Sequence, residues 1–320
     1  MTYNNCPLFK LQSKKKLFAL LGIRNSKVFS KQNKISSLTM PYVDVPKPRL
    51  IEPSNSQNLK QAQKIIKNAL QKINIPSYVF SGVKGKSYAG NAKYHLGVVN
   101  VFQTDLTAFF PNTKRDKVYR FFLDELQTSP DVAEILTNIT TIDINKTNCD
   151  KSAIVSFLTS KNVKRMNHLI SGSPTSTILA YFANHVMFDE IYNYANKQGV
   201  KMTVYVDDIT FSSSNKISSK FKKSVLSIIR KHGHMVSLKK TESKDKRMAK
   251  CITGVIITPQ GNIAVKNSLR HKTIIALRRY KENPTIENKN VLRGYVNAAR
   301  QVENGIYPSI MKLLKVNNPS

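Results

Sequence analysis

Three aspartates have the type and spacing needed for chemistry on a charged substrate. Asp207 and Asp208 are adjacent and divide a β-rich stretch, residues 201–213, so the pattern predicts that they lie at the tip of a hairpin. Asp105 follows another strand pattern, Val98–Thr104. Acids between apolar strands are costly unless a cation lies beside them. An ordinary Asp-Asp turn is the alternative, and the position of Asp105 at the end of its own strand argues against it.

Carboxylates placed in this way can hold two divalent ions. Phosphoryl transfer from a nucleoside triphosphate to a hydroxyl requires charge neutralisation on the nucleophile, the leaving group and the reacting phosphorus, and two shared ions meet that need. Mg²⁺ prefers carboxylates, waters and phosphates to the side chains of His or Cys. We therefore expect two Mg²⁺ ions, with Mn²⁺ as an alternative, at Asp105, Asp207 and Asp208.

The composition indicates a polyanionic partner. The chain has 320 residues, with 51 Lys and Arg against 19 Asp and Glu, and a formal net charge of +32. The basic residues extend from Lys10 to Lys315, which favours a long charged groove over a single basic arm. Such a charge opposes compaction by self-repulsion, so it is expected to serve nucleic acid. A ribosome-type structural protein has a similar composition and is not excluded by it.

Cysteine usage and hydropathy indicate a cytoplasmic protein. Cys6, Cys149 and Cys251 are few and far apart, and no CxxC pair occurs, so neither a disulfide framework nor a structural zinc site is predicted. The apolar run Leu17–Ile23 is much too short to cross a bilayer and lacks a signal-like cleavage pattern. We therefore expect no membrane partner.

Periodicity predicts the elements that must position the aspartates. Apolar residues at helical spacing predict a helix at 58–73, and Thr113 is expected to cap a helix that runs to Leu126. Residues 128–170 are predicted to be helical with polar interruptions. The order indicates an α+β fold, with a strand–helix–hairpin–helix–strand core and a helical C-terminal third. The other predicted helices are 14–21, 176–197, 217–232, 267–281, 285–301 and 308–314, and the other strands are 234–238, 251–258 and 262–266.

Two phenylalanines follow the first aspartate closely. In the run Asp105–Phe110, an aromatic ring just beyond the metal ligand can lie under the incoming sugar, where it would clash with a 2′-hydroxyl. Phe110 is the candidate for this selection of deoxynucleotides, and Phe109 is expected to face the core. The alternative is that both rings are core residues.

Together these residues resemble the motifs of reverse transcriptases. Tyr205–Asp208 resembles the YxDD box, and Asp105–Phe110 resembles the first catalytic motif. Gly172–Ser176 is similar to the Gly-rich turn and helix start that pack against the nascent base pair. Val236–Thr241 is similar to the lysine motif after the palm helix, and the stretch from Lys47 to Pro53 is similar to the fingers segment that grips the triphosphate.

Further motifs resemble the retron branch of that family. Asn91-Ala92-Lys93-Tyr94-His95 fits its NAxxH signature, and Ile252-Thr253-Gly254 fits its VTG signature with one conservative change. Arg293-Gly294 is similar to a pair on its thumb helix. For His95, a hydrogen-bonded core residue is the alternative interpretation. The resemblance covers about residues 40–315 and implies that a cognate structured RNA is recognised by Asn91, Ala92, His95, Ile252, Thr253, Gly254 and Arg293.

The chain departs from the family pattern at three positions. Ser171 stands where Gln is usual, Thr177 where Pro is common, and Ser237 where Asn is common. These differences concern the stacking of the nucleotide. They leave the metal carboxylates unchanged.

The resemblance implies a role for each residue of the predicted catalytic centre. Asp105, Asp207 and Asp208 are the expected metal ligands, together with the backbone carbonyl of Leu106. Lys240 is expected to protonate or orient the leaving pyrophosphate. In a chain so rich in lysine, a solvated side chain is the alternative for Lys240.

The resemblance also predicts the nucleotide site. Lys47 and Arg49 are expected to bind the β- and γ-phosphates, where arginine offers a bidentate fork. Gly172 and Phe110 are expected to border the nucleotide. A solvated basic strand is the alternative for Lys47 and Arg49. Basic residues of the C-terminal helices are expected to follow the phosphates of template and primer, which would make binding salt-dependent.

The expected architecture is that of a right-hand polymerase, with fingers, an RRM-like palm and a helical thumb. A basic N-terminal helical extension is expected at 1–40 and part of the fingers at 41–100. The palm, with a fingers insertion, is expected at 101–250. A primer-grip hairpin and helical thumb are expected at 251–320.

The function implied by the resemblance is RNA-directed DNA synthesis from deoxynucleoside triphosphates. The enzyme would copy part of a dedicated noncoding RNA from a 2′-hydroxyl of that RNA, leaving multicopy single-stranded DNA joined to RNA and bound to the protein. Retron systems act in defence against phage with an effector, which we expect to be a separate polypeptide. The few acids after Asp208 predict that a host RNase H removes the template.

Two other functions compete with this prediction. One is another bacterial reverse transcriptase, of the group II intron or abortive-infection type, against which the NAxxH motif argues. The other is a noncatalytic RNA-binding scaffold. Intact Asp105, Asp207 and Asp208 argue against a scaffold, because clustered acids beside nucleic acid serve it no purpose.

Overall fold

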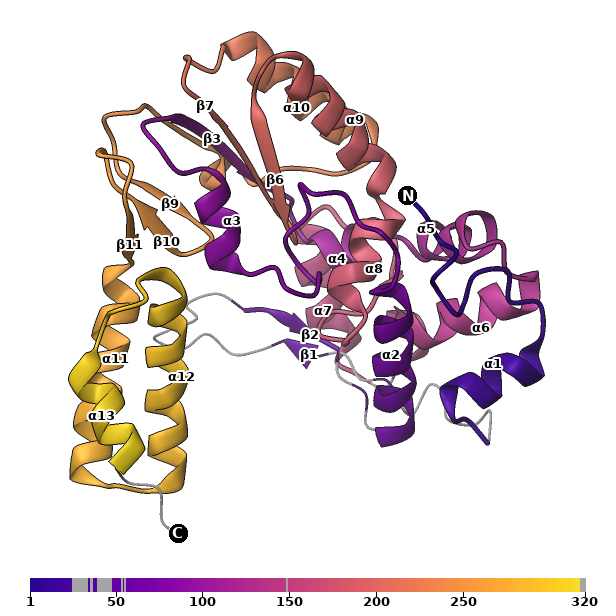
Figure 1. The fold of residues 1–320 in the computed structure, drawn as a ribbon. Helices are drawn as coiled ribbons and strands as arrows, with labels where there is room; N and C mark the ends of the chain where they lie inside the picture. The colour runs from indigo at the N-terminus through magenta and orange to yellow at the C-terminus, as the bar shows by residue number, and fades with distance from the viewer. Residues whose placement is uncertain are drawn as a thin grey trace.

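An antiparallel four-stranded sheet lies at the centre of the fold (Figure 1). The computed structural model of the protein describes residues 1–24, 34, 37–38, 48–52, 54, 56–147 and 149–316. The order of the strands in the central sheet is β6-β7-β3-β8. Their bounds are β3 (Asn100–Asp105), β6 (Lys201–Tyr205), β7 (Asp208–Ser213) and β8 (Glu242–Lys244).

Alternation along β3 allows the sheet to be covered on both faces, because successive side chains of a strand point to opposite sides. Phe102 stacks on Phe211 with ring centroids 5.6 Å apart, and Phe211 meets Phe221 edge-on at 5.4 Å. These rings belong to the core formed with α9 (His185–Lys197) and α10 (Ser219–Lys231). The neighbouring Val101 packs in a second cluster, with residues of α3 (Tyr88–Tyr94) and a small C-terminal sheet.

The predicted helix at 176–197 is broken at Asn184, where α8 (Ser176–Ala183) ends and α9 begins. The amide of Asn184 donates to the Ala180 carbonyl at 2.9 Å and to Thr113 Oγ1 at 3.0 Å. Its Oδ1 accepts from Lys117 Nζ at 2.7 Å. Such side-chain bonds compete with the helical backbone, and they explain why the single-helix prediction was wrong at this residue.

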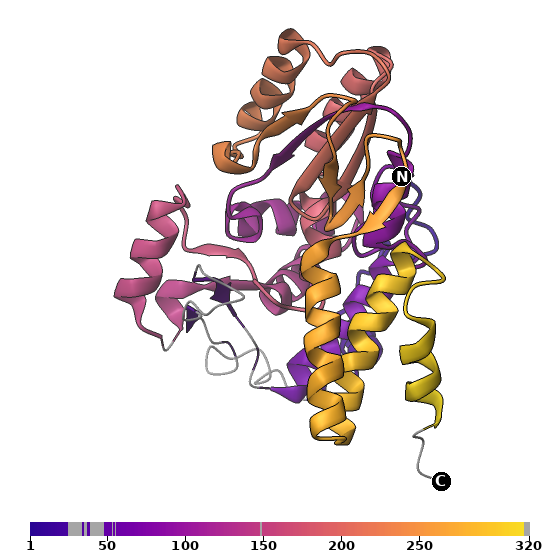
Figure 2. The same ribbon diagram turned by 90° about the vertical axis from the view of Figure 1, so that its left-hand side faces the viewer.

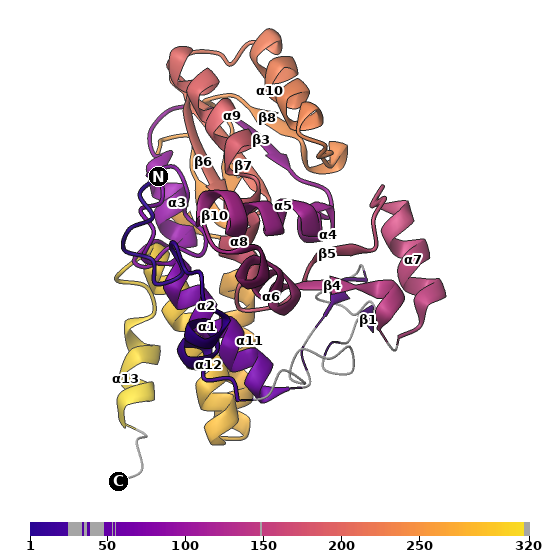
Figure 3. The same cartoon turned by 90° about the vertical axis from the view of Figure 1, so that its right-hand side faces the viewer.

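The prediction of helix throughout 128–170 was wrong in part. This region contains α6 (Pro130–Thr140) and α7 (Lys151–Ser160), but also an antiparallel pair formed by β4 (Thr141–Asp143) and β5 (Asn167–Leu169). The β-branched run Thr140-Thr141-Ile142 favours an extended chain at the end of α6. Figure 3 shows α7 projecting from this pair, away from the central sheet.

Thr113 is not the N-cap of a helix that runs to Leu126, contrary to prediction. It ends the short α4 (Phe109–Asn112), and its hydroxyl donates to the Phe109 carbonyl at 2.9 Å. Lys114 precedes α5 (Arg115–Arg120), which continues as a π-helical turn at Phe121–Glu125. The predicted helix at 58–73 is confirmed as α2 (Gln57–Leu70).

The C-terminal part consists of a three-stranded sheet and three helices (Figure 2). The predicted hairpin around Pro259-Gln260-Gly261 is confirmed, but the single strand predicted at 251–258 was wrong: it turns back at Thr253-Gly254, both at positive φ, and forms two antiparallel strands. The helices have a separate core that includes Ala276, Tyr280 and Leu292. In Figure 2 they form an orange and yellow group below the sheets. The bounds are β9 (Lys250–Ile252), β10 (Val255–Ile257), β11 (Ile263–Val265), α11 (Asn267–Glu282), α12 (Ile286–Val302) and α13 (Pro308–Val316).

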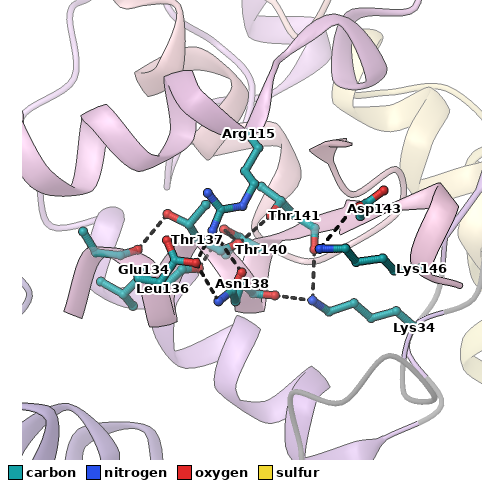
Figure 4. Close-up of polar contacts among 11 residues, drawn as sticks. Lys34, Arg115, Glu134, Leu136, Thr137, Asn138, Thr140, Thr141, Asp143 and Lys146 are labelled. Carbon is teal, nitrogen blue, oxygen red and sulfur yellow. Dashed lines mark hydrogen bonds and ion pairs between the residues drawn. The ribbon is translucent and has the colours of Figure 1, made fainter. Parts of the chain in front are cut away.

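The predicted helix at 14–21 is confirmed as α1 (Lys14–Leu21). The N-terminal part packs on α6 through α1 and through Lys34 (Figure 4). Lys34 Nζ donates to the carbonyls of Asn138 and, at 3.0 Å, of Thr141, where α6 ends. A cation at a helix C-terminus is favourable, because carbonyl groups there lack partners within the helix. A polar cavity of about 560 Å³ opens beside this contact. The short β1 (Ser37–Leu38) pairs with β2 (Leu50–Ile51).

The segment between α10 and β8 differs from prediction in one respect. Residues 234–238 do not form a strand; Val236 alone pairs with Leu106, and a 3-10 turn follows at Leu238–Lys240.

A membrane-spanning segment would need a long apolar helix, and the described part of the chain contains none.

Candidate active site

The strand register of the central sheet brings the three predicted aspartates together. Asp105 ends β3 and pairs with Asp208, the first residue of β7. Asp207 lies in the tight turn before it. One carboxylate oxygen from each residue lies within 4.8 Å of the others, and no other such group of metal-binding side chains occurs in the described part of the chain. The predicted carboxylate cluster is therefore present.

The turn that carries Asp207 has an unusual backbone. Val206 has φ +59°, whereas Asp207 is not in the positive-φ region. This pattern is that of a type II′ hairpin turn, in which the first central position favours glycine. The Val206 N–H donates to Ser81 Oγ at 2.8 Å, and the Leu106 N–H donates to the Asp207 carbonyl at 2.9 Å. These bonds hold the turn from both sides.

Ser81 reaches the turn because its own segment runs beside β6. The Phe80 N–H donates to the Val204 carbonyl at 2.9 Å, and the Val204 N–H donates to the Tyr78 carbonyl at 2.9 Å. Gly82 follows with φ +71°, and a Cβ there would lie 3.3 Å from Thr177 Cγ2. The segment is thus wedged between β6 and the start of α8. Ser81 was not predicted from the sequence, because no local pattern marks a serine that bonds to a distant turn.

The carboxylates repel one another in a partly buried site. Burial, followed by the charge of Asp105, raises the pKa of Asp207. Burial also raises the pKa of Asp208, with further contributions from Asp207 and Asp105. Lys240 Nζ donates to Asp105 Oδ2 at 2.6 Å. Burial by itself lowers the pKa of Lys240, but the bond to Asp105 and the nearby carboxylates raise it overall.

This donor set fits hard divalent cations. Convergent carboxylate oxygens are the ligands that Mg²⁺ and Mn²⁺ prefer, and no His or Cys belongs to the cluster. A bound cation would relieve the repulsion between the acids. Asp105, Asp207 and Asp208 are therefore suited to hold the ions, with Lys240 supplying a single positive charge in their absence.

The lysine motif reaches the site by pairing with the first catalytic motif. The Ser237 N–H donates to the Asp105 carbonyl at 2.9 Å, and the Thr107 N–H donates to the Met235 carbonyl at 2.8 Å. The 3-10 turn that follows directs Lys240 back to Asp105. Ser237, one of the departures from the family pattern, thus acts here through its backbone.

The predicted nucleotide residues have different environments. Phe109 is buried against Phe188 and His234, as expected for a core residue, whereas Phe110 is only partly buried. Gly172 has φ +92°, a conformation that favours glycine. Arg49 is exposed. Lys47 lies outside the described residues.

The two retron-like signatures contact each other although they lie far apart in the sequence. Asn91 Nδ2 donates to Thr253 Oγ1 at 3.4 Å, and Thr253 Oγ1 donates to the Tyr88 carbonyl at 2.8 Å. Thr253 and Gly254 both have positive φ, +46° and +84°, and form the tight turn between β9 and β10. Ala92 and Ile252 are buried in the same cluster.

Two other predicted RNA-recognition residues lie in contrasting places. His95 is fully buried, and its ring nitrogens bond to Ser212 Oγ and Thr203 Oγ1, each at 2.7 Å. Burial lowers the pKa of His95 to about 3, so the ring is uncharged at neutral pH. This geometry is that of a hydrogen-bonded core residue. Arg293 is exposed on α12.

A buried pair of hydrogen-bonded side chains lies near the predicted nucleotide residues and was not predicted from the sequence. His168 Nε2 lies 3.0 Å from Glu52 Oε1, and neither side chain is exposed. A signal existed: Glu52 is the only acid between Asp44 and Asp105. A lone acid in so basic a region is more easily explained by a buried partner than by solvent.

Comparison with known proteins assigns the family. Residues 45–249 match the family described as Reverse transcriptase (RNA-dependent DNA polymerase). The matched region contains the three aspartates, Lys240 and the NAxxH segment.

Curated relatives are retron enzymes. Retron Se72 reverse transcriptase from Salmonella heidelberg (strain 579083-10) is 28% identical over 254 residues, 76% of this chain and 58% of the relative. Retron Ec86 reverse transcriptase from Escherichia coli is 28% identical over 207 residues, 64% of this chain and 57% of the relative. The chain thus spans less than two thirds of the length of either relative. It belongs to the reverse transcriptase (RNA-dependent DNA polymerase) family and is similar to the retron members of that family.

Proposed function

We propose that this protein is an RNA-directed DNA polymerase. The observation that carries the proposal is the cluster of Asp105, Asp207 and Asp208, held by two strands of a central sheet and contacted by Lys240. A site of this kind supports transfer of a nucleotide from a triphosphate to a hydroxyl. With two Mg²⁺ ions bound, it would supply charge neutralisation for the attacking oxygen, the leaving oxygen and the phosphorus between them.

Each of the other residues of the site has its own proposed role in the reaction. The three aspartates and the Leu106 carbonyl would hold the ions. The ammonium of Lys240, whose pKa is raised beside Asp105, would remain charged and orient or protonate the leaving pyrophosphate. Arg49 and Lys47 would bind the β- and γ-phosphates. Gly172 would let the nascent base pair approach closely, and Phe110 would exclude a 2′-hydroxyl.

We assign fingers, palm and thumb to the parts of the fold as the sequence predicts them. The central sheet with α9 and α10 serves as the palm. The α2, α6 and β4-β5 region, with α7 inserted, serves as fingers. The helices α11, α12 and α13, which have their own core, serve as a thumb that follows the phosphates of template and primer.

A structured noncoding RNA is the proposed template and partner. The names of the similar proteins, retron reverse transcriptases, support this choice. The contact between Asn91 and Thr253 also supports it, because it unites two retron-like signatures in one place. The RNA would prime synthesis from its own 2′-hydroxyl and stay joined to multicopy single-stranded DNA. We place this activity in the cytoplasm, in an anti-phage retron with a separate effector and with a host RNase H.

The test is the nucleic acid that the protein carries. The protein is purified from cells that hold its native locus, and wild type is compared with the double variant Asp207→Asn, Asp208→Asn. A discrete RNA-linked single-stranded DNA in wild type, absent in the variant, is the expected result. RNA without DNA in both samples would contradict polymerase function and favour a noncatalytic scaffold.

A further inference from the structure

The buried pair Glu52 and His168 joins two segments of the proposed nucleotide site. Both carboxylate oxygens of Glu52 are used: Oε1 lies 3.0 Å from His168 Nε2, and Oε2 accepts the Ser171 N–H at 2.7 Å. The Glu52 N–H also donates to the Ser171 carbonyl at 2.8 Å. Glu52 therefore holds the residue before Gly172 by its side chain and its backbone together.

The strand that precedes Glu52 alternates between two faces. Leu50 packs on an apolar cluster and Glu52 is 2% exposed, so these residues point inward. Arg49 and Ile51 are exposed and point to the other face. A Cβ added to Gly172 would lie 4.0 Å from Ile51 Cγ2, so the outward face of the strand adjoins the Gly172 turn. The Arg49 side chain therefore lies on the face of the strand where the nucleotide is proposed to bind.

The contacts of Glu52 with His168 and Ser171 fix the register of the strand that carries Arg49. Arg49 is three residues from Glu52, at most about 10 Å of extended chain. A one-residue slip of a strand turns every side chain to the opposite face, and this would direct Arg49 into the core. The strand pair β1-β2 is only two residues long, so it specifies register weakly by itself.

The hydrogen bond between Glu52 and His168 holds both side chains in a fixed position. A hydrogen bond between fully buried side chains is not weakened by competing water, and it tolerates little displacement. His168 is itself fixed by β5, through pairing with Ile142. Its Nδ1 has no hydrogen-bond partner among the described atoms, so the bond to Glu52 is the one that orients the ring.

We propose that Glu52 and His168 are positioning residues that set Arg49 against the Gly172 turn and thereby determine the affinity for the incoming nucleotide. This inference rests on the proposed polymerase function. It assigns no contact with substrate to either residue. Their effect is expected in the KM for deoxynucleoside triphosphate and not in the turnover of bound nucleotide.

The test compares the steady-state kinetics of four variants on a primed RNA template with Mg²⁺. Glu52→Gln keeps the size of the side chain but replaces one acceptor oxygen with a donor amide group, and it should raise KM at least about tenfold with kcat per active site nearly unchanged. His168→Gln is the milder second variant and should raise KM in the same direction. Asp124→Asn, at an exposed acid of the π-helical turn Phe121–Glu125, is the matched control and should leave KM unchanged.

The Arg49→Ala variant distinguishes a role of Glu52 in positioning Arg49 from a general loss of protein stability. If Glu52 acts through Arg49, Glu52→Gln should add little to the KM of an Arg49→Ala enzyme, since coupled residues are not additive. Additive effects, or a loss of melting temperature and active fraction at unchanged KM, would overturn the inference and leave a purely structural pair. If wild type incorporates no deoxynucleotide on this template or on its native RNA, the polymerase function fails, and the inference fails with it.

Discussion

Replacing Ser81 with alanine is predicted to disturb the catalytic turn without altering a carboxylate. Ser81 Oγ accepts the Val206 N–H at 2.8 Å, and Ser81 is only 5% exposed. Loss of the acceptor leaves a partly buried N–H without its partner, at a cost of about 1–3 kcal/mol. The positive φ of Val206 already costs a β-branched residue about 1–2 kcal/mol. The variant turn is therefore expected to leave its catalytic conformation.

The predicted magnitude follows from these two costs. If about 1.4–2.8 kcal/mol is lost from the positioning of the aspartates, kcat should fall roughly 10- to 100-fold. Val206→Gly should restore much of that kcat in the Ser81→Ala background, because glycine adopts positive φ without strain. Global stability is expected to recover less, since Val206 also packs against the core.

The assay is single-turnover incorporation of a deoxynucleotide, with urea unfolding measured in parallel. Ser77→Ala, at an exposed serine of the same segment, is the control and should change neither quantity. A Ser81→Ala protein with lower stability but unchanged kcat would refute the reasoning. Failure of Val206→Gly to restore kcat would refute the part that concerns strain.

Three further predictions concern the metal site, a buried histidine and the sugar gate. Asp208→Asn should abolish DNA synthesis yet stabilise the metal-free protein at neutral pH by about 1–4 kcal/mol, because folding raises the pKa of this carboxyl among mutually repelling acids. Mg²⁺ should raise the melting temperature of wild type more than that of the variant, and the opposite order of the two shifts would contradict a metal site at Asp208. His95 has a folded pKa of about 3, below the ordinary 6.5, so its contribution to stability is full above pH 6.5 and is lost as pH falls toward 3. Wild type should therefore lose about 1.4 kcal/mol per pH unit between pH 6 and pH 4 relative to His95→Gln in urea unfolding, whereas the exposed His271→Gln should track wild type; parallel curves for all three would refute the buried neutral ring. Phe110→Ala should raise incorporation of ribonucleotides relative to deoxynucleotides at least about tenfold, while Phe109→Ala should chiefly lower stability, and unchanged sugar selectivity in Phe110→Ala would remove it from the nucleotide site.

The metal carboxylates were predictable because local pattern alone places them. Asp207 and Asp208 interrupt a β-rich run, and Asp105 ends a strand of alternating burial, so each position follows from its neighbours. The short turn sets the register of β6 with β7, whereas the pairing of Asp105 with Asp208 joins β3 to β7, two strands far apart in the sequence, and no local pattern sets it.

Features set by distant contacts were not predictable. Asn184 breaks a helix because its amide bonds to Thr113, Lys117 and Ala180, and no window of the sequence contains those partners together. The β4-β5 pair was missed for a similar reason, since α7 separates strands of only three residues each. Ser81 and Glu52 act through partners more than a hundred residues away.

The contact between the NAxxH segment and the β9-β10 turn has a consequence for exchange of parts between relatives. Asn91 and Thr253 belong to different halves of the chain, yet their side chains share one hydrogen bond, and Tyr88 reaches the Ala298 carbonyl of α12 at 2.5 Å. A chimera that takes the chain from β9 to α13 from a retron relative would separate both pairs of partners. Such chimeras should fold when α3 and the β9-β10 turn are taken from the same parent. The two segments should therefore be inherited as one unit, although they lie far apart in the sequence.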